Sequence, residues 1–326
     1  MFSSHFTPVA PFTNNELGEV SFLMKVRAFA PGHITGFFQI CDEADKPLEK
    51  GSRGAGVTIS RGVTTSVEVE AAKIHQTHIT INGHADPAPV SEAVIFSLLK
   101  HHPDEAFKIN VCHEVAMPIG YGFGTSGSGA LSLALALSKA LDLPLTRIEA
   151  AQIAHIAEVQ QKTGLGTVIA ETSGGVEIRT TAGGPGVGVI ETIPTQKDLR
   201  VVCLPFGPIA TPDYLSNEPA RRRINELGGL LTDALRAHPT IERFLAYSRH
   251  FAEHIQILTD RVRAVLQEGE DAGFTCSSAI FGENVFSLVK LHEVQELKRI
   301  FDRHKTSKQE VLVMNVDHQG AQLLNG

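Results

Sequence analysis

The feature that most constrains this chain is a run of small residues between a predicted strand and a predicted helix. It spans residues 118–130 and reads PIGYGFGTSGSGA, with strand-like sequence at 107–115 before it and an apolar helix at 126–141 after it. Glycines let the backbone turn tightly and approach a ligand closely. The first turn of a helix directs free N–H groups and the positive end of its dipole toward such a loop. The stretch therefore predicts a phosphate-binding loop, and a glycine-rich helix entry without a ligand is the alternative.

The predicted nucleotide contacts all lie on this loop or on the first turn of the helix. They are Pro118, Gly120, Gly122, Phe123, Gly124, Thr125, Ser126, Gly127 and Ser128.

Two common phosphate-loop families do not fit the loop. A dinucleotide-binding fold needs an acidic residue at the end of a second strand about 20 residues further on. Asp142 is the candidate, but it ends a predicted helix. A Walker A loop needs a lysine after its last glycine, where this chain has Ser128. The spacing of proline, glycines, Thr125 and Ser126 instead resembles the loop of the GHMP kinases, which include galactokinase, homoserine kinase and mevalonate kinase. The resemblance implies their two-domain α+β fold.

Length and composition narrow the class of protein further. A chain of 326 residues predicts two domains. A net charge of −7 without a long basic run argues against nucleic acid as a partner. The four cysteines are far apart in sequence, which indicates neither a zinc site nor a disulfide framework. The longest apolar stretch, residues 130–137, is too short to span a membrane, and no signal peptide is evident. We therefore expect a cytoplasmic protein.

The predicted domains are residues 24–190 and 191–326, divided by a stretch rich in Gly, Pro and Thr at 182–194. Residues 1–23 have no periodicity, so we expect a disordered leader, or a working start at Met24. The alternative is an ordered arm.

In the first domain, alternating residues predict a mixed or antiparallel sheet with strands at 24–30, 37–41, 57–60, 63–70, 78–81, 107–115 and 176–181. A turn at 31–36 and a glycine-rich loop at 51–56 are expected between them. Ser91 is the predicted N-cap of a helix, and Thr146 with Glu149 predicts a capping box for the next.

The second domain is predicted to be an α+β sandwich of the ferredoxin-like type, with helices on one face of a sheet. Its expected strands are at 200–205, 284–291 and 311–316, with helical sequence at 217–272 and 293–304. The turn at 275–282 lies where GHMP kinases carry a second glycine-rich motif. It holds one glycine, so an ordinary polar turn is an equal alternative.

Within the GHMP kinases, the chain resembles the archaeal pantoate kinases. The segments that carry this resemblance are residues 31–38, 51–56, 154–159 and 163–166, the pair Gly174-Gly175, and Arg179. The resemblance implies ATP and Mg²⁺, with phosphorylation of pantoate to 4-phosphopantoate in coenzyme A biosynthesis, and a possible homodimer.

The resemblance also assigns roles to individual residues. Ser126 and Glu158 match the two positions that contact the metal, and a surface pair of Glu158 with Lys162 is the alternative. Pantoate carries a carboxylate, which the planar fork of Arg179 suits; an ion pair with Glu177 is the alternative. The other expected substrate contacts are His155, Ser52 and Arg53. For these three, the alternatives are a core histidine and a flexible turn.

One catalytic position departs from the family pattern. GHMP kinases often place an aspartate, a candidate base for the attacking hydroxyl, where this chain has Thr167. A threonine cannot act as a carboxylate base. Either positioning and metal suffice, which a loose transition state would allow, or activity has been lost. Glu171 and Glu177 are the nearby acidic candidates. Two further hypotheses stay open: a kinase for another small hydroxy acid or alcohol, such as mevalonate or homoserine, and a non-catalytic binding protein.

Overall fold

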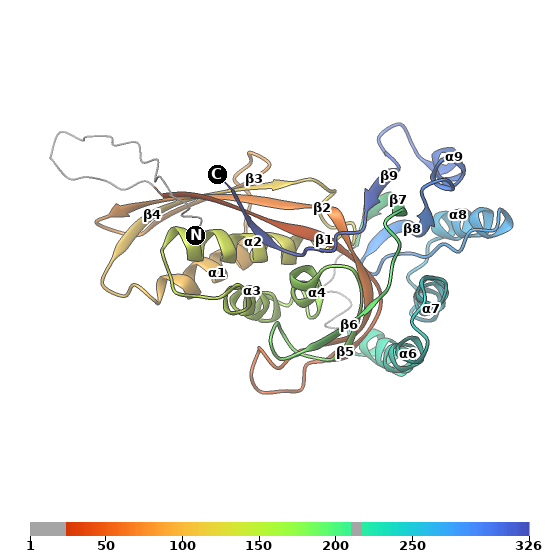
Figure 1. The fold of residues 1–326 in the computed structure, drawn as a ribbon, viewed down its shortest axis with the longest axis horizontal. Helices are drawn as coiled ribbons and strands as arrows, with labels where there is room; N and C mark the ends of the chain where they lie inside the picture. Colours follow the sequence, from red (N-terminus) through yellow and green to blue (C-terminus); the bar gives the residue numbers. More distant parts are fainter. Residues whose placement is uncertain (1–23, 210–216, 326) are drawn as a thin grey trace, which may run out of the picture.

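Two long antiparallel strands, β1 (Met24–Cys41) and β2 (Gly51–Ala72), form the spine of the molecule (Figure 1). The computed structural model describes residues 24–209 and 217–325, so the predicted leader at 1–23 lies outside the described residues. The two strands pair from Met24 opposite Val69 to Cys41 opposite Gly51, with register shifts at Pro31/Gly32 and Thr35/Phe37. The turn predicted at 31–36 and the loop predicted at 51–56 are therefore wrong, because both segments continue these strands.

The glycines in the second of these segments allow neighbouring groups to approach the strand closely. A Cβ atom on Gly54 would lie 2.3 Å from the carbonyl oxygen of Phe37, and one on Gly56 would lie 2.2 Å from His33 Nε2. On its other side, this part of β2 pairs with β5 (Val176–Thr181). The glycines are thus packing residues of a strand that has partners on both sides.

The first sheet has the order β10-β1-β2-β4-β3, where β10 is Gln322–Leu324. Strand β5 also pairs with β2, and β6 (Val189–Ile193) pairs with β5. Strand β3 (Gln76–Ile81) runs parallel to β4 (Ala106–Val115). The other pairings in this sheet are antiparallel, so the predicted mixed sheet is confirmed.

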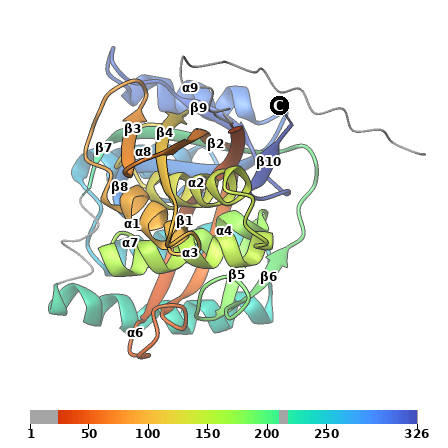
Figure 2. The same cartoon turned by 90° about the vertical axis from the view of Figure 1, so that its left-hand side faces the viewer.

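Four helices cover one face of this sheet, as Figures 1 and 2 show. They are α1 (Pro89–Leu99), α2 (Thr125–Ala140), α3 (Arg147–Gln161) and α4 (Thr167–Ser173). Helix α2 follows the glycine-rich loop and is buried on nearly every side, which explains its unbroken apolar sequence. The capping box of Thr146 and Glu149 is confirmed. Ser91 does not cap α1: the helix begins two residues earlier, and the Ser91 side chain is buried against His113.

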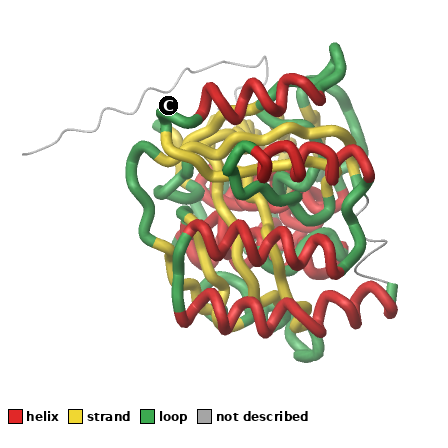
Figure 3. Tube along the Cα trace, turned by 90° about the vertical axis from the view of Figure 1, so that its right-hand side faces the viewer, coloured by secondary structure: helices red, strands yellow, loops and turns green. Residues whose placement is uncertain are grey.

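The second sheet has the order β8-β7-β9 among the described residues, with antiparallel pairings. Its strands are β7 (Leu199–Pro208), β8 (Gly282–Lys290) and β9 (Leu312–Asn315). Figure 3 shows the helices of this half as a layer in front of the strands. These helices are α6 (Glu218–Ala237), α7 (Ile241–His254), α8 (Asp260–Asp271) and α9 (Val294–His304). The α+β class is confirmed.

The two halves are not divided at a single point in the chain. The predicted boundary between residues 190 and 191 falls inside β6, which belongs to the first sheet. The last strand, β10 (Gln322–Leu324), also returns to the first sheet, where it pairs with β1. Aromatic rings join the halves. The ring centroid of Phe37 on β1 lies 6.4 Å from that of Phe244 and 6.3 Å from that of Phe251, both on α7. No helix among the described residues is long and apolar enough to cross a bilayer.

We expect Gly54→Ala to destabilise the protein much more than Gly83→Ala. Both glycines have positive φ, +151° and +82°, so both substitutions strain the backbone. Only at Gly54 would the new Cβ also meet backbone atoms, whereas nothing lies within 4 Å of it at Gly83. Gly83→Ala should cost about 1 kcal/mol and Gly54→Ala about 3 kcal/mol or more. Urea denaturation measures both, and equal losses would contradict the close strand pairing.

Candidate active site

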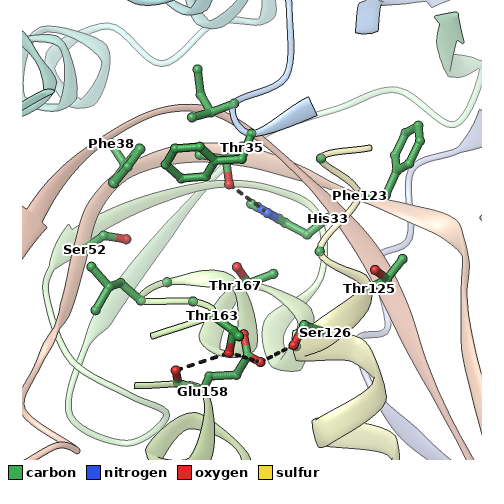
Figure 4. Close-up of a pocket in the computed structure, with 18 of the residues that line it drawn as sticks. His33, Thr35, Phe38, Ser52, Phe123, Thr125, Ser126, Glu158, Thr163 and Thr167 are labelled. Carbon is green, nitrogen blue, oxygen red and sulfur yellow. Dashed lines mark hydrogen bonds between the residues drawn. The ribbon is translucent and has the colours of Figure 1, made fainter. Parts of the chain in front are cut away.

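A cavity of about 250 Å³ lies where the two halves meet. Its wall is built by β1, the glycine-rich loop, the connection between α3 and α4, and the turn before β8. In Figure 4, His33 and Thr35 lie on one side of the cavity, while Ser126, Glu158 and Thr167 lie on the opposite side. Segments that are far apart in the sequence therefore converge on one cavity.

The glycine-rich loop forms one edge of this cavity. Gly124 has φ +67° and immediately precedes the first residue of α2, so a residue tolerant of left-handed backbone is needed there. Gly120, Gly122 and the segment from Phe123 to Gly127 all line the cavity. The start of α2 thus faces the space in which phosphate is expected.

Two of the predicted nucleotide contacts do not reach the cavity. Pro118 is not among the lining residues, and Ser128 is fully buried. The Ser128 hydroxyl lies 2.9 Å from the carbonyl oxygen of Pro31 and 2.9 Å from Glu171 Oε1. These contacts tie the loop to β1 and α4, so Ser128 supports the loop from behind.

The turn at 275–282 and the start of β8 brace β1 and the glycine-rich loop from the second half of the molecule. Asn284 donates from Nδ2 to the carbonyl oxygen of Tyr121 at 2.6 Å, and Ile280 donates its N–H to the Thr35 carbonyl at 3.1 Å. Ile280 and Phe281 line the cavity. The serines of this turn are buried instead, so the partial motif supplies apolar wall and backbone contacts.

The two expected metal contacts lie side by side. Ser126 donates from Oγ to Glu158 Oε1 at 2.5 Å, and Thr163 donates to the same oxygen at 2.8 Å. Burial raises the pKa of Glu158, while these two hydroxyl donors lower it. Glu158 is 2% exposed, so it is not the solvent-facing partner of Lys162 that the alternative required.

This pair suits Mg²⁺ better than a metal held by protein ligands alone. No cluster of three or more His, Cys, Asp or Glu suited to a metal ion occurs in the described part of the chain. Magnesium commonly takes one or two protein oxygens and completes its octahedral shell with phosphate and water. One carboxylate beside a serine hydroxyl at a phosphate loop fits that requirement.

Arg179 and Ser52 meet at another wall of the cavity. A Cβ on Gly166 would lie 2.1 Å from Ser52 Oγ and 2.8 Å from Arg179 Nε, so both side chains pass close to this glycine. Arg179 is 1% exposed, and its Nη1 pairs with Glu177. Its Nε has no hydrogen-bond partner among the residues that the structure describes. Burial lowers the pKa of Arg179, and the Glu177 charge raises it. The guanidinium is therefore held by Glu177 with one donor left for a ligand.

Arg53 and His155, the other two expected substrate contacts, are not among the residues that line the cavity. Successive side chains on a strand point to opposite faces, so Arg53 projects away from Ser52. It pairs with Asp233 and donates to the Thr180 carbonyl at 3.0 Å. His155 lies on α3, where its Nε2 is 2.9 Å from the carbonyl oxygen of Lys50. Burial lowers the pKa of His155. It supports the start of β2 and does not face the cavity.

No local sequence pattern predicts a role for His33, although its side chain lines the cavity. His33 Nε2 lies 3.1 Å from Glu177 Oε1, and its Nδ1 lies 3.3 Å from Thr35 Oγ1. Its backbone N–H donates to the Phe123 carbonyl at 2.9 Å. The histidine lies in the segment at 31–38 that carries the family resemblance. Its place in that segment is the sequence feature that could have marked it as a site residue. Its partner Glu177 is 144 residues away in sequence.

Thr167 begins α4 and lines the cavity opposite His33 (Figure 4). The two acidic residues considered near it do not line the cavity. Glu171 lies beneath the glycine-rich loop, and burial raises its pKa well above the ordinary range. Glu177 lies behind His33 and Arg179, to both of which it is hydrogen-bonded.

A second cavity of about 210 Å³ adjoins the first at Ile119, Thr125, Ser126 and Thr163. Its wall is mainly apolar and includes Val63, Ile81 and Val90. His113 also lines it, with Nδ1 2.8 Å from Thr65 Oγ1 and Nε2 3.1 Å from Ser91 Oγ. An apolar cavity beside a phosphate loop suits a flat heteroaromatic ring.

The sequence matches known proteins over most of its length. Residues 88–175 match the family described as GHMP kinases N terminal domain. The chain is 34% identical to the pantoate kinase of Thermococcus kodakarensis over 280 residues, covering 85% of this chain and 92% of that one. It is also 34% identical to the pantoate kinase of Methanocaldococcus jannaschii over 271 residues, covering 82% and 94%.

Solved structures agree with these sequence matches. A phosphotransferase related to the CoA biosynthesis pathway has a TM-score of 0.82 at 31% identity, covering 92% of this chain and 98% of that one. A homoserine kinase from Cytophaga hutchinsonii has a TM-score of 0.66 at 17% identity, covering 92% and 97%. At that identity, the second likeness shows the fold alone.

We expect His113 to make the protein less stable below neutral pH. Burial lowers its pKa from 6.5 to about 4, so the unfolded chain takes up a proton more readily than the folded protein. Its contribution, about 3 kcal/mol, is present above pH 6.5 and is lost as the pH falls through 4. Urea denaturation between pH 7.5 and 4.5 should show a shallower pH dependence for His113→Gln than for wild type. The exposed His78, changed to Gln, is the control and should follow wild type.

Proposed function

Because the chain belongs to the pantoate kinase family of the GHMP kinases, we propose that it transfers the γ-phosphoryl group of ATP to pantoate, giving 4-phosphopantoate and ADP. The observation that carries the proposal is the placement of Arg179 in the same cavity as the phosphate loop. One wall suits phosphate and the other offers a buried guanidinium to a carboxylate. A small hydroxy acid can meet both at once.

The nucleotide is assigned to the loop and the adjoining apolar cavity. Backbone N–H groups at the start of α2 would hold phosphate oxygens, and the apolar cavity would take the adenine ring. Because the two cavities share Thr125 and Ser126, one ligand can occupy both. This arrangement directs the terminal phosphate toward Thr167 and His33.

Ser126 and Glu158 would hold Mg²⁺ beside the phosphates. When bound, the ion neutralises charge on the β- and γ-phosphate oxygens. The protein's own contribution is to fix the two oxygen ligands: Glu158 is held by Thr163, and Ser126 is held at the first turn of α2. Little covalent chemistry is needed, since phosphoryl transfer depends chiefly on positioning and charge.

The carboxylate of pantoate is assigned to Arg179, with Ser52 beside it. The unpartnered Nε of Arg179 supports this, because a buried N–H donor without a partner is costly unless a ligand supplies one. Binding there would leave a hydroxyl of the substrate free to face the phosphate loop. Such a placement would suit in-line attack on the γ-phosphorus.

The test is ADP release from ATP with pantoate, mevalonate or homoserine, each with Mg²⁺ and with EDTA. We expect turnover with pantoate and Mg²⁺, and none with EDTA. Turnover with mevalonate or homoserine in place of pantoate would assign a different acceptor to the same site. Nucleotide binding without turnover of any acceptor would instead support the binding-protein hypothesis that Thr167 raised.

Arg179→Lys should raise the KM for pantoate far more than the KM for ATP. A lysine keeps the charge next to Glu177 but loses the planar fork. The loss of one charge-assisted contact costs on the order of 2 kcal/mol, about thirtyfold in affinity. Arg53→Ala is the matched control, because Arg53 lies outside the cavity, and both KM values should stay at wild-type levels. A larger effect on pantoate from Arg53→Ala than from Arg179→Lys would contradict the assignment.

A further inference from the structure

We propose that His33, oriented by Glu177, accepts the proton of the attacking substrate hydroxyl, the role that Thr167 cannot fill. The proposal rests on the kinase function proposed above and names a further catalytic residue for it. It starts from a simple observation about the cavity wall. Among the described residues that line the cavity, the ionisable side chains are those of His33, Glu158 and Arg179.

The other two ionisable side chains, Glu158 and Arg179, are assigned to other roles. Glu158 accepts hydrogen bonds from Ser126 and Thr163 and is assigned to the metal. Arg179 is a cation and has no lone pair to offer. Thr167, at the position of the expected carboxylate, has a hydroxyl that stays protonated. His33 is thus the remaining ionisable side chain on this wall with a lone pair that can accept a proton.

Glu177 determines which nitrogen of His33 is basic. The Glu177 carboxylate accepts hydrogen bonds and lies 3.1 Å from Nε2, so the proton of neutral His33 belongs on Nε2. Nδ1 then carries the lone pair. A buried carboxylate holds a catalytic imidazole in one tautomer in the same way in serine hydrolases, on unrelated folds.

The lone pair of Nδ1 is available to a substrate. Its protein partner is Thr35 Oγ1 at 3.3 Å, which is long for a hydroxyl hydrogen bond. Thr35 also lines the cavity, so a substrate hydroxyl that enters there can replace this weak contact. In Figure 4 the imidazole and Thr35 face the space above Thr167.

The backbone fixes His33 relative to the phosphate loop. The His33 N–H donates to the Phe123 carbonyl, one residue before Gly124. A hydroxyl between Nδ1 and the loop therefore lies between a base and the position expected for the γ-phosphate. The charged and titratable groups near His33 are Glu177 and Arg179 on β5, Glu158 on α3, and Glu171 on α4 beneath the loop.

The proposed step moves the γ-phosphoryl group to the substrate and the hydroxyl proton to His33. A bond forms between the substrate hydroxyl oxygen and the γ-phosphorus, while the bond from that phosphorus to the bridging oxygen of ADP breaks. The hydroxyl proton passes to Nδ1, and Glu177 balances the resulting imidazolium. ADP leaves with the electron pair of the broken bond, and His33 returns its proton to solvent after product release.

The kinetic test compares His33→Gln with a variant that also carries Thr167→Asp. Glutamine can still donate to Glu177 but cannot take a proton. We expect kcat at saturating pantoate, ATP and Mg²⁺ to fall at least 100-fold, the usual scale for losing a general base. Thr167→Asp in the same background should restore at least tenfold of that loss, because it supplies a carboxylate across the cavity. His78→Gln, on an exposed strand, is the control and should keep wild-type kcat.

The pH dependence of kcat separates a base from a structural role. In wild type, kcat should fall on the acid side as an imidazole is protonated. In the rescued double variant this limb should move to lower pH, because the ordinary pKa of aspartate, about 3.9, is well below that of histidine, about 6.5. A His33→Gln kcat within threefold of wild type would overturn the proposal. So would a double variant that binds ATP normally but regains no turnover.

A measurement that needs no turnover keeps this proposal separate from the proposed function. Imidazole ¹⁵N chemical shifts at pH 8, assigned by difference with His33→Gln, report which nitrogen carries the proton. We expect the proton on Nε2, with Nδ1 unprotonated. A proton on Nδ1 would overturn the proposal even in an active kinase. A wild-type protein that phosphorylates none of the three acceptors would overturn the kinase function itself.

Discussion

The buried carboxylate of Glu177 is the group on which the arrangement of the cavity depends. It is fully buried and is hydrogen-bonded to His33 on β1 and to Arg179 on its own strand. An isolated buried carboxylate costs several kcal/mol, so this position is tolerable only while both partners are present. The carboxylate thereby fixes the two side chains to which we assign the substrate carboxylate, Arg179, and the hydroxyl proton, His33. Because removing one partner would leave a buried charge, the three positions constrain one another.

The sheet makes this cluster possible by bringing β1, β2 and β5 together without intervening side chains. Gly56 on β2 leaves the space that the His33 ring occupies, and Glu177 is its partner on β5. The same close packing extends to the second half of the molecule. There the ring centroid of Phe38 lies 5.6 Å from that of Phe281, in the turn before β8. Asn284, at the start of β8 just after that turn, contacts the glycine-rich loop. The phosphate loop is thus held between the two halves, and the cavity forms where their shared core ends.

Local sequence patterns predicted the features that local physics controls. Helix α2 and the capping box of α3 agree with the prediction because apolar periodicity and a Thr-x-x-Glu pattern act within one element. The segment at 51–56 was assigned to a loop because glycine usually disrupts a strand. Its pairing with β5 depends on residues more than a hundred positions away, such as Arg179 opposite Gly54, which no local pattern reports. Ser52 and Arg53 were grouped as substrate contacts for the same reason, whereas strand alternation sends them to opposite faces.

Local patterns are also the reason that the sequence points to the aspartate position and not to His33. A motif shows which residue is missing at one position, here the carboxylate at Thr167, but not what faces that position across a cavity. His33 and Thr167 are on different elements, β1 and α4, and only the fold places them on opposite walls of one space. In a loose transition state the substrate hydroxyl keeps its proton until late in the reaction. The base therefore need not lie on a particular helix. It needs only to face the hydroxyl with a free lone pair. By that criterion, two different groups can accept the hydroxyl proton: a carboxylate on α4, or the imidazole of His33 on β1, which Glu177 holds in place.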